Sequence, residues 1–416
     1  MADRPRLNHS PFVLTNASGL RLVALGLGLA TLLTACGSTS SAFTQRTTRV
    51  RLSDVHTQTD THVQAAPGEA SLARLQQLTV AQLAGQRVIY SYSGLQPPRE
   101  LLERIRHGEA AGVIFFAPNI ASVPQLRQVV RELQAANGRS PVKAPLLMMT
   151  DQEGGQVRRL PMPPYASQKQ IGEVPGPQEH AAGAGREAAE TLKAAGLNTN
   201  LAPVLDVYRE AGNFIDQYER SYSSNPSLVS TLGSAFISSQ QAHGVAATAK
   251  HFPGLGSAAR DQDTDEKPVT IQLQLPQLRA VDERPYKAAI KARVRLIMPS
   301  WATYPAFNTD LPAGLSSAII QGELRGRLGF RGVTITDSIA AGALAPFGSI
   351  SERAALAATA GDDLILGSGR TVNEDSPTIG SSALRGIAAA IGAREAPRAT
   401  AELAVADVIA MREVLG

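Results

Sequence analysis

Beyond about residue 76, short apolar runs alternate with longer stretches in which apolar side chains recur every three or four residues. A short apolar run bounded by polar residues or glycine is typical of a buried strand, and the longer spacing is typical of an amphipathic helix. The predicted strands cover residues 87–91, 112–117, 146–150, 198–204, 245–250, 295–300, 332–336 and 363–366. The predicted helices cover residues 97–107, 124–137, 183–195, 226–243, 276–291, 316–327 and 351–360.

Eight strand–helix units in about 290 residues predict an α/β fold, a single (β/α)8 TIM-like barrel. A doubly wound open sheet has the same alternation and is the alternative. Polar residues directly after the strands favour the barrel, because all strand ends of a barrel meet on one face, whereas an open sheet gathers them only at a switch point. These residues are Asn119, Asp151, Asp206, His251, Ser300, Asp337 and Ser368. Helices within residues 380–415 are expected to close the domain, without a second α/β sandwich domain.

The first 35 residues have the pattern of an export signal. Arg4, Arg6 and Arg21 precede an uncharged apolar stretch, Leu22–Ala35. At 1.5 Å per residue this stretch covers about 21 Å, which is short of a bilayer core of roughly 30 Å, so we expect a signal peptide rather than a membrane-spanning helix. It ends in Leu-Thr-Ala-Cys36, which resembles a bacterial lipobox, and Cys36 is therefore predicted to carry a lipid. A buried cysteine in a core helix is the alternative.

Residues 36–75 are rich in Ser, Thr and Gln and lack apolar periodicity, so they are predicted to form a flexible tether before the domain of residues 76–416. Together with the leader, this organisation predicts an exported lipoprotein of the cell envelope, held at a membrane through its N-terminal lipid.

Composition excludes several other classes of protein. The chain is 43% hydrophobic and 18% charged, too apolar for a disordered protein, and its single Cys excludes a disulfide framework and a Cys-based zinc site. The 40 basic and 36 acidic residues are scattered, so no nucleic-acid partner is expected. Phosphate-loop, dinucleotide and nucleophile-elbow motifs are absent, and we expect no cofactor and no metal. A monomer is expected.

Two predicted strands end in residues that suit the binding of sugar hydroxyls. Asp151 is followed by the pair Gly154-Gly155, where backbone can approach a ligand closely. Lys250 and His251 end another strand at Pro253-Gly254, and both side chains reach the mouth only if the strand stops there. The alternative for Asp151 is an ordinary helix cap.

Two further segments carry carboxylates. The run Arg260-Asp-Gln-Asp-Thr-Asp-Glu266 resembles the start of a calcium loop but lacks its glycine and final glutamate, so a solvated acidic loop is the alternative. Asp337 ends a buried strand and is either a nucleophile or a structural cap.

Five motifs follow one another along the chain: Thr150-Asp-Gln-Glu-Gly-Gly155, Leu201-Ala-Pro-Val-Leu-Asp-Val207, Glu219-Arg-Ser-Tyr222, Ala249-Lys-His-Phe-Pro-Gly254 and Thr336-Asp337. In this order they resemble glycoside hydrolase family 3, and within it the single-domain bacterial β-N-acetylglucosaminidases. The resemblance covers about residues 75–370 and implies the same barrel. It implies that Asp337 is the catalytic nucleophile and that five side chains hold the sugar: Asp151, Arg159, Arg220, Lys250 and His251.

One position departs from the pattern of these enzymes, which carry Asp-Ser-His with a histidine as general acid/base. The same offset here gives Asp261-Gln262-Asp263, so Asp263 is predicted as the acid/base, with Asp261 as its partner. A carboxylic acid can donate the proton if burial or a neighbouring carboxylate raises its pKa.

The resulting prediction is a retaining exo-β-glycosidase that removes terminal N-acetyl-β-D-glucosamine from cell-wall or chitin-type oligosaccharides through a glycosyl-Asp intermediate. The alternative is a sugar-binding surface lipoprotein on the same fold that has lost turnover. The expected nucleophile favours the enzyme, and the missing histidine favours the binding protein.

Overall fold

The computed structural model describes residues 75–369 and 374–415, which belong to one compact unit, His62–Gly416. The predicted signal peptide, the lipidated Cys36 and all but the last residue of the predicted tether lie outside the described residues. Among the described residues, no helix is long and apolar enough to cross a membrane.

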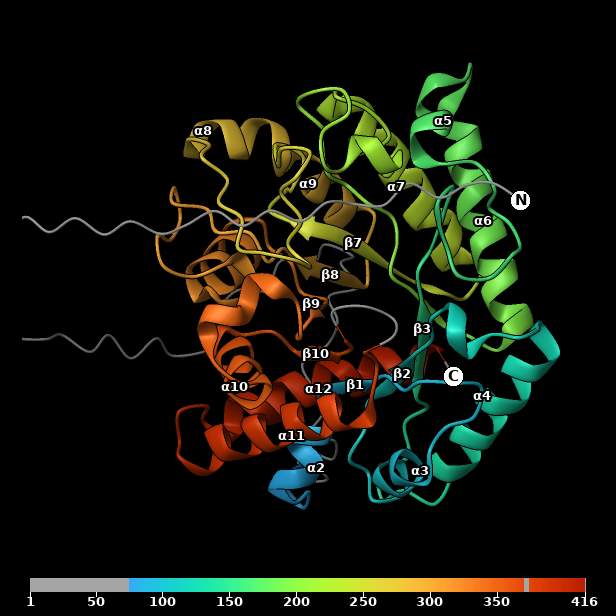
Figure 1. Ribbon diagram of the computed structural model, residues 1–416, viewed down its shortest axis with the longest axis vertical. Coiled ribbons are helices and arrows are strands. Elements are labelled where there is room, and N and C mark those ends of the chain that lie inside the picture. The colour runs from blue at the N-terminus through green and yellow to red at the C-terminus, as the bar shows by residue number, and fades with distance from the viewer. Residues whose placement is uncertain (1–74, 370–373, 416) are drawn as a thin grey trace, which may run out of the picture. The chain divides into compact units, whose positions relative to one another are not determined.

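Eight parallel strands close into a barrel in the order β1-β10-β9-β8-β7-β6-β3-β2, which confirms the predicted fold (Figure 1). Each of the eight predicted segments overlaps one of them, and β7, β9 and β10 continue one or two residues beyond the predicted ends. The strands are β1 Val88–Tyr90, β2 Gly112–Ile114, β3 Leu147–Thr150, β6 Thr199–Asn200, β7 Ala246–Phe252, β8 Leu296–Pro299, β9 Val333–Ser338 and β10 Leu364–Gly367.

Helices connect successive strands and surround the barrel (Figure 1). They are α2 Val80–Gly85, α3 Arg99–Arg106, α4 Val123–Asn137, α5 Gln168–Glu173, α6 Pro177–Ala195, α7 Pro226–Ala242, α8 Leu275–Gln277, α9 Arg284–Lys291, α10 Ile350–Ala360, α11 Pro377–Gly392 and α12 Arg398–Leu415. A π-helix, Ala318–Arg327, takes the place of an α-helix between β8 and β9. Local sequence sets several of these boundaries: Ser349 and Glu352 form a capping box at the start of α10, and Gly361 ends it in the left-handed conformation.

One element was not expected from the sequence. Directly after β3, the short strands β4 Gln152–Gly154 and β5 Val157–Arg158 form an antiparallel hairpin. It is too short to show an alternation of apolar and polar residues, which is the signal that identifies a strand in a sequence.

The C-terminal helix α12 closes the end of the barrel at which the strands begin. Val408 and Met411 of α12 pack into the apolar cluster that fills the barrel interior. The buried Arg412 guanidinium donates to the carbonyls of Ala144 and Pro145, at 2.7 and 2.6 Å, just before β3. The expected C-terminal closure is therefore present, and α12 is part of the barrel core.

This closure predicts that Met411→Ala lowers the free energy of unfolding by about 2–4 kcal/mol, because it leaves a cavity in the barrel interior. Urea unfolding followed by circular dichroism would measure the change. The matched control on the same helix is Val414→Ala, where the side chain is 64% exposed and the expected change is within about 0.5 kcal/mol. Equal effects of the two substitutions would contradict the packing described for α12.

Candidate active site

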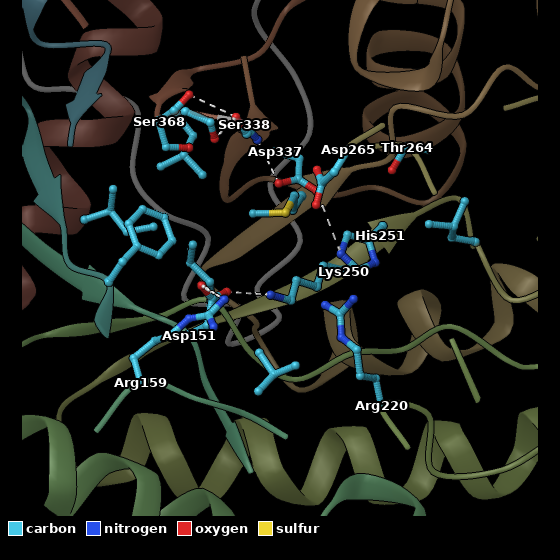
Figure 2. Close-up of a pocket in the computed structure, with 18 of the residues that line it drawn as sticks. Asp151, Arg159, Arg220, Lys250, His251, Thr264, Asp265, Asp337, Ser338 and Ser368 are labelled. Carbon is cyan, nitrogen blue, oxygen red and sulfur yellow. Dashed lines mark hydrogen bonds and ion pairs between the residues drawn. The ribbon is translucent and has the colours of Figure 1, made fainter. Parts of the chain in front are cut away.

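A pocket of about 230 Å³ opens at the end of the barrel where the strands finish. Residues from β2, β7, β8, β9 and β10, or from the segments that follow the barrel strands, line it, as barrel topology requires. Figure 2 shows its polar side chains converging from several of these strands. The predicted site residues that line it are Asp151, Arg159, Arg220, Lys250, His251 and Asp337.

The Lys250 ammonium is the centre of a buried charge network. Its Nζ lies 2.8 Å from Asp151 Oδ1 and 2.8 Å from Glu153 Oε1. Burial alone would lower the pKa of Lys250, but these two carboxylates outweigh it and raise the pKa, so the ammonium stays charged. Burial likewise opposes ionisation of Asp151, but Lys250 and Arg159 hold its pKa below the ordinary value.

Glu153 links this network to Arg220 through a bidentate ion pair. Arg220 Nε and Nη2 donate to the two Glu153 oxygens at 3.0 and 2.9 Å, a geometry that holds the guanidinium in one orientation. Burial alone would raise the pKa of Glu153, but the charges of Arg220 and Lys250 outweigh this effect and lower the pKa to about 2. The pocket thus presents fixed cations and a fixed carboxylate, the arrangement that suits a ring of hydroxyl groups.

His251 is oriented by Asp206. Its Nδ1 donates to Asp206 Oδ2 at 2.8 Å, and the other Asp206 oxygen accepts from the backbone N–H groups of His251 and Leu255. The Nε2 atom therefore faces the pocket, 4.0 Å from Asp337 Oδ2 (Figure 2).

Lys250 and His251 both line the pocket although β7 continues to Phe252. Neighbouring residues of a regular strand point to opposite faces. Here the pairing of β7 with β8 shifts register between Lys250 and Phe252, and the Lys250–His251 peptide is cis. The strand stops directly before Pro253, as expected from the sequence, and the interrupted pairing lets the two neighbouring side chains both reach the pocket.

Asp337 occupies the end of β9 and has a side chain that is 26% exposed to the pocket. Its Oδ1 accepts from the Ser338 N–H at 2.7 Å, which fixes the carboxylate direction. Figure 2 shows the Asp265 carboxyl next to it, on the side of the pocket away from Asp151.

Asp265, two residues beyond the predicted acid, lines the pocket. Burial together with repulsion from Asp337 and Asp263 raises the pKa of Asp265 to about 7. The residue as a whole keeps an exposed surface, while its carboxyl lies against Asp337 among the groups that line the pocket, and a bound sugar would cover the carboxyl and favour the neutral acid further.

The two aspartates predicted for this role lie elsewhere in the loop. Asp263 is half-buried, and its Oδ1 accepts from the Asp265 N–H at 2.8 Å. Asp261, predicted as the partner of the acid, is 80% exposed, pairs with Lys267 at 3.0 Å and is not among the residues that line the pocket.

Backbone hydrogen bonds join the Asp265 loop to the connection after the Asp337 strand. The Gly342 N–H donates to the Asp265 carbonyl at 2.8 Å, and the Ala343 N–H donates to the Thr264 carbonyl at 3.0 Å. A Cβ atom at Gly342 would lie 2.1 Å from the Glu266 carbonyl oxygen, so only glycine permits this approach. The two acidic side chains are therefore placed relative to each other through the backbone.

Sequence reasoning missed the roles of Glu153 and Asp265 and left Asp206 undecided between an orienting role and a helix cap. The signal for Glu153 was available, because it follows Asp151 by two residues in extended chain and so points to the same side. No signal in the sequence distinguishes Asp265 from its acidic neighbours. Among the described residues, no group of His, Cys, Asp and Glu side chains could hold a metal ion.

Known proteins resemble this chain in sequence and in fold. Residues 69–411 match the model of the glycosyl hydrolase family 3 N-terminal domain. A protein of Arthroderma benhamiae described as an uncharacterized secreted glycosyl hydrolase is 48% identical over 299 residues, which are 71% of this chain and 84% of that protein. A beta-hexosaminidase of Stenotrophomonas maltophilia is 36% identical over 275 residues, 63% of this chain and 77% of that one.

Solved structures give the same result. The family 3 β-N-acetylglucosaminidase of Paenibacillus sp. str. FPU-7 superposes with a TM-score of 0.74 at 32% identity, covering 81% of this chain and 63% of that one. The β-N-acetylhexosaminidase of Beutenbergia cavernae superposes with a TM-score of 0.71 at 27% identity, covering 80% of this chain and 98% of that one. The chain therefore belongs to glycosyl hydrolase family 3 and is a glycoside hydrolase.

Proposed function

We propose that the protein is a retaining exo-β-glycosidase that hydrolyses terminal N-acetyl-β-D-glucosaminides, with Asp337 as nucleophile and Asp265 as general acid/base. The observation that carries this proposal is the placement of these two carboxyls side by side at a pocket whose opposite wall is the Lys250 network. The names of the Stenotrophomonas, Paenibacillus and Beutenbergia relatives support the N-acetylhexosamine as the sugar.

The size of the pocket supports cleavage at a chain end. Its volume of about 230 Å³ is below the roughly 300–1,000 Å³ of sites for drug-sized ligands. One sugar ring fits such a space, whereas an internal segment of a polysaccharide needs a groove that is open at both ends. The cationic and anionic groups on its wall would bind the hydroxyls of that ring.

In the first step, Asp337 forms a bond to the anomeric carbon while the bond from that carbon to the leaving oxygen breaks. Asp265 gives its proton to that oxygen, so the aglycone leaves as a neutral alcohol. An acid with a pKa raised to about 7 is protonated over the lower part of the neutral range and suits this task.

In the second step, water attacks the anomeric carbon and the bond to Asp337 breaks. Asp265, now ionised, takes a proton from that water, which returns both carboxyls to their starting state and releases the sugar with its β configuration. The same residue serves as acid and then as base, so one raised pKa is sufficient for both steps.

The segments before residue 75 add a proposal about location. We propose that the chain is exported and held at a membrane by a lipid on Cys36. The support is the uncharged stretch Leu22–Ala35 before the single cysteine, together with the description of the Arthroderma relative as secreted.

Amide substitutions separate the roles of the three acidic residues. Asp337→Asn is expected to lower kcat on p-nitrophenyl N-acetyl-β-glucosaminide by roughly 10⁴-fold, because an amide is a poor nucleophile. Asp265→Asn is expected to lower kcat/KM by about 10²–10⁴-fold on N,N′-diacetylchitobiose, whose leaving sugar needs a proton, and much less on the first step with the aryl substrate. Asp263→Asn is the matched control and is expected to keep most of the activity near pH 5. If Asp263→Asn shows the larger loss on chitobiose, the acid has been assigned to the wrong residue.

The pH profile gives a second test. General-acid catalysis needs protonated Asp265, so kcat/KM on chitobiose should fall about tenfold per pH unit above about 7. Asp263→Asn removes a neighbouring negative charge, which lowers the pKa of Asp265, and the fall should then begin at a lower pH. An alkaline limb that does not move in Asp263→Asn, or that begins near pH 4 in the wild type, would contradict the assignment.

A further inference from the structure

The face of the barrel opposite the pocket is formed by the starts of the strands, by the connections that lead into them from the preceding helices, and by α12. We call this face the floor. Because strands and helices alternate in direction, every helix-to-strand connection of the barrel reaches it. The composition of these connections therefore determines what the floor can contact.

Basic residues dominate these connections. They are Arg139, Lys143, Lys193, His243, Lys291, Arg293, Arg295 and Arg331. Within the described part of the chain, none of them forms an ion pair with a carboxylate. Lys193 and Lys291 lie in the last turns of α6 and α9, where the helix dipole favours cations, but most of the others lie beyond the helix ends.

The acidic residues of these connections do not offset this charge. Glu109 pairs with Arg104, Asp363 pairs with Arg325, and Asp362 is completely buried. The exposed acids on this side, Glu395 and Glu413, belong to α12 and to the connection before it. The connections into β3, β8 and β9 therefore keep their positive charge.

A cleft of about 800 Å³ lies in this face, between the starts of β8 and β9 and the end of α12. Arg293, Arg295 and Arg331 are among the residues that line it. The Arg295 guanidinium is half-buried, and burial lowers its pKa without any carboxylate to offset the effect. A cation that is partly removed from water and has no partner is a site that an anion would stabilise.

Another part of the cleft lining is apolar. Ile290, Phe330, Met411 and Val414 form it; Phe330 and Met411 are buried, and Val414 is 64% exposed. Guanidinium groups beside an exposed valine on an apolar base match a molecule that carries a phosphate next to hydrocarbon. Single-stranded nucleic acid fits less well, because it needs stacking on exposed aromatic rings, and the exposed Tyr165 and Tyr218 lie on strand-to-helix connections at the opposite end of the barrel.

We propose that the floor binds the surface of an anionic phospholipid membrane, with phosphate head groups on Arg293, Arg295 and Arg331 and hydrocarbon against Val414. Bound in this way, the barrel directs its pocket away from the lipid, toward substrates outside the membrane. The contact acts independently of hydrolysis, since no residue of the pocket takes part in it.

The test uses residues 62–416, the compact unit that contains the closed barrel and its three apolar clusters. It measures sedimentation with phosphatidylcholine vesicles, with and without about 30 mol% phosphatidylglycerol. Binding is expected only to the anionic vesicles and should weaken as salt rises from about 0.1 to about 0.5 M. The combined variant R293Q/R295Q/R331Q should bind about 100-fold more weakly, since each arginine near an anionic surface increases the binding constant by roughly a factor of five.

The matched control is R127Q/R131Q/R385Q, which removes the same charge from exposed positions on α4 and α11. It should bind as the wild type does, and both combined variants should hydrolyse p-nitrophenyl N-acetyl-β-glucosaminide at the wild-type rate. If the wild type does not bind anionic vesicles, or if the control loses as much binding as the floor variant, the proposal is wrong. It is also wrong if soluble polyphosphate displaces the protein from vesicles at a phosphate concentration equal to that of the lipid, because the cleft would then select phosphate without hydrocarbon.

Discussion

The ammonium group of Lys250 sets the conditions for the rest of the site. A buried cation needs compensating charge, and here it receives two carboxylates, Asp151 after β3 and Glu153 in the hairpin that follows. Glu153 then has a second oxygen for Arg220, which comes from the connection after β6. One buried charge thus links segments of the chain that lie far apart in sequence and gives the pocket a wall of fixed polar groups before any ligand arrives.

The two carboxyls on the other side of the pocket are held in different ways, and the difference suits their proposed tasks. Asp337 ends a strand of the barrel and is directed by a backbone N–H. Asp265 lies on a loop, in the repulsive field of Asp337 and Asp263, and this field works with burial to raise its pKa. Because the loop is joined to Gly342 and Ala343 by backbone hydrogen bonds, its side chains can change without loss of its position.

The parts of the structure that the sequence predicted are those with a strong local signal. Each barrel strand is an apolar run, and Asp151, Lys250, His251 and Asp337 stand at or next to the strand ends, so their convergence follows from barrel topology. Asp265 was not singled out because it reaches the pocket through the path of a loop, which depends on contacts with residues almost 80 positions later. The β4–β5 hairpin and the register shift in β7 were missed for another reason: neither produces a periodic pattern of apolar and polar residues in the sequence.

The position of α12 has a consequence for how the protein is made. Val408 and Met411 complete the interior of the barrel, yet they lie in α12, an 18-residue helix that follows all eight barrel strands in the sequence. During synthesis, the strands leave the ribosome before this helix does, so one end of the barrel interior stays open to water until α12 has been made. The growing chain therefore exposes apolar barrel residues until α12 covers them.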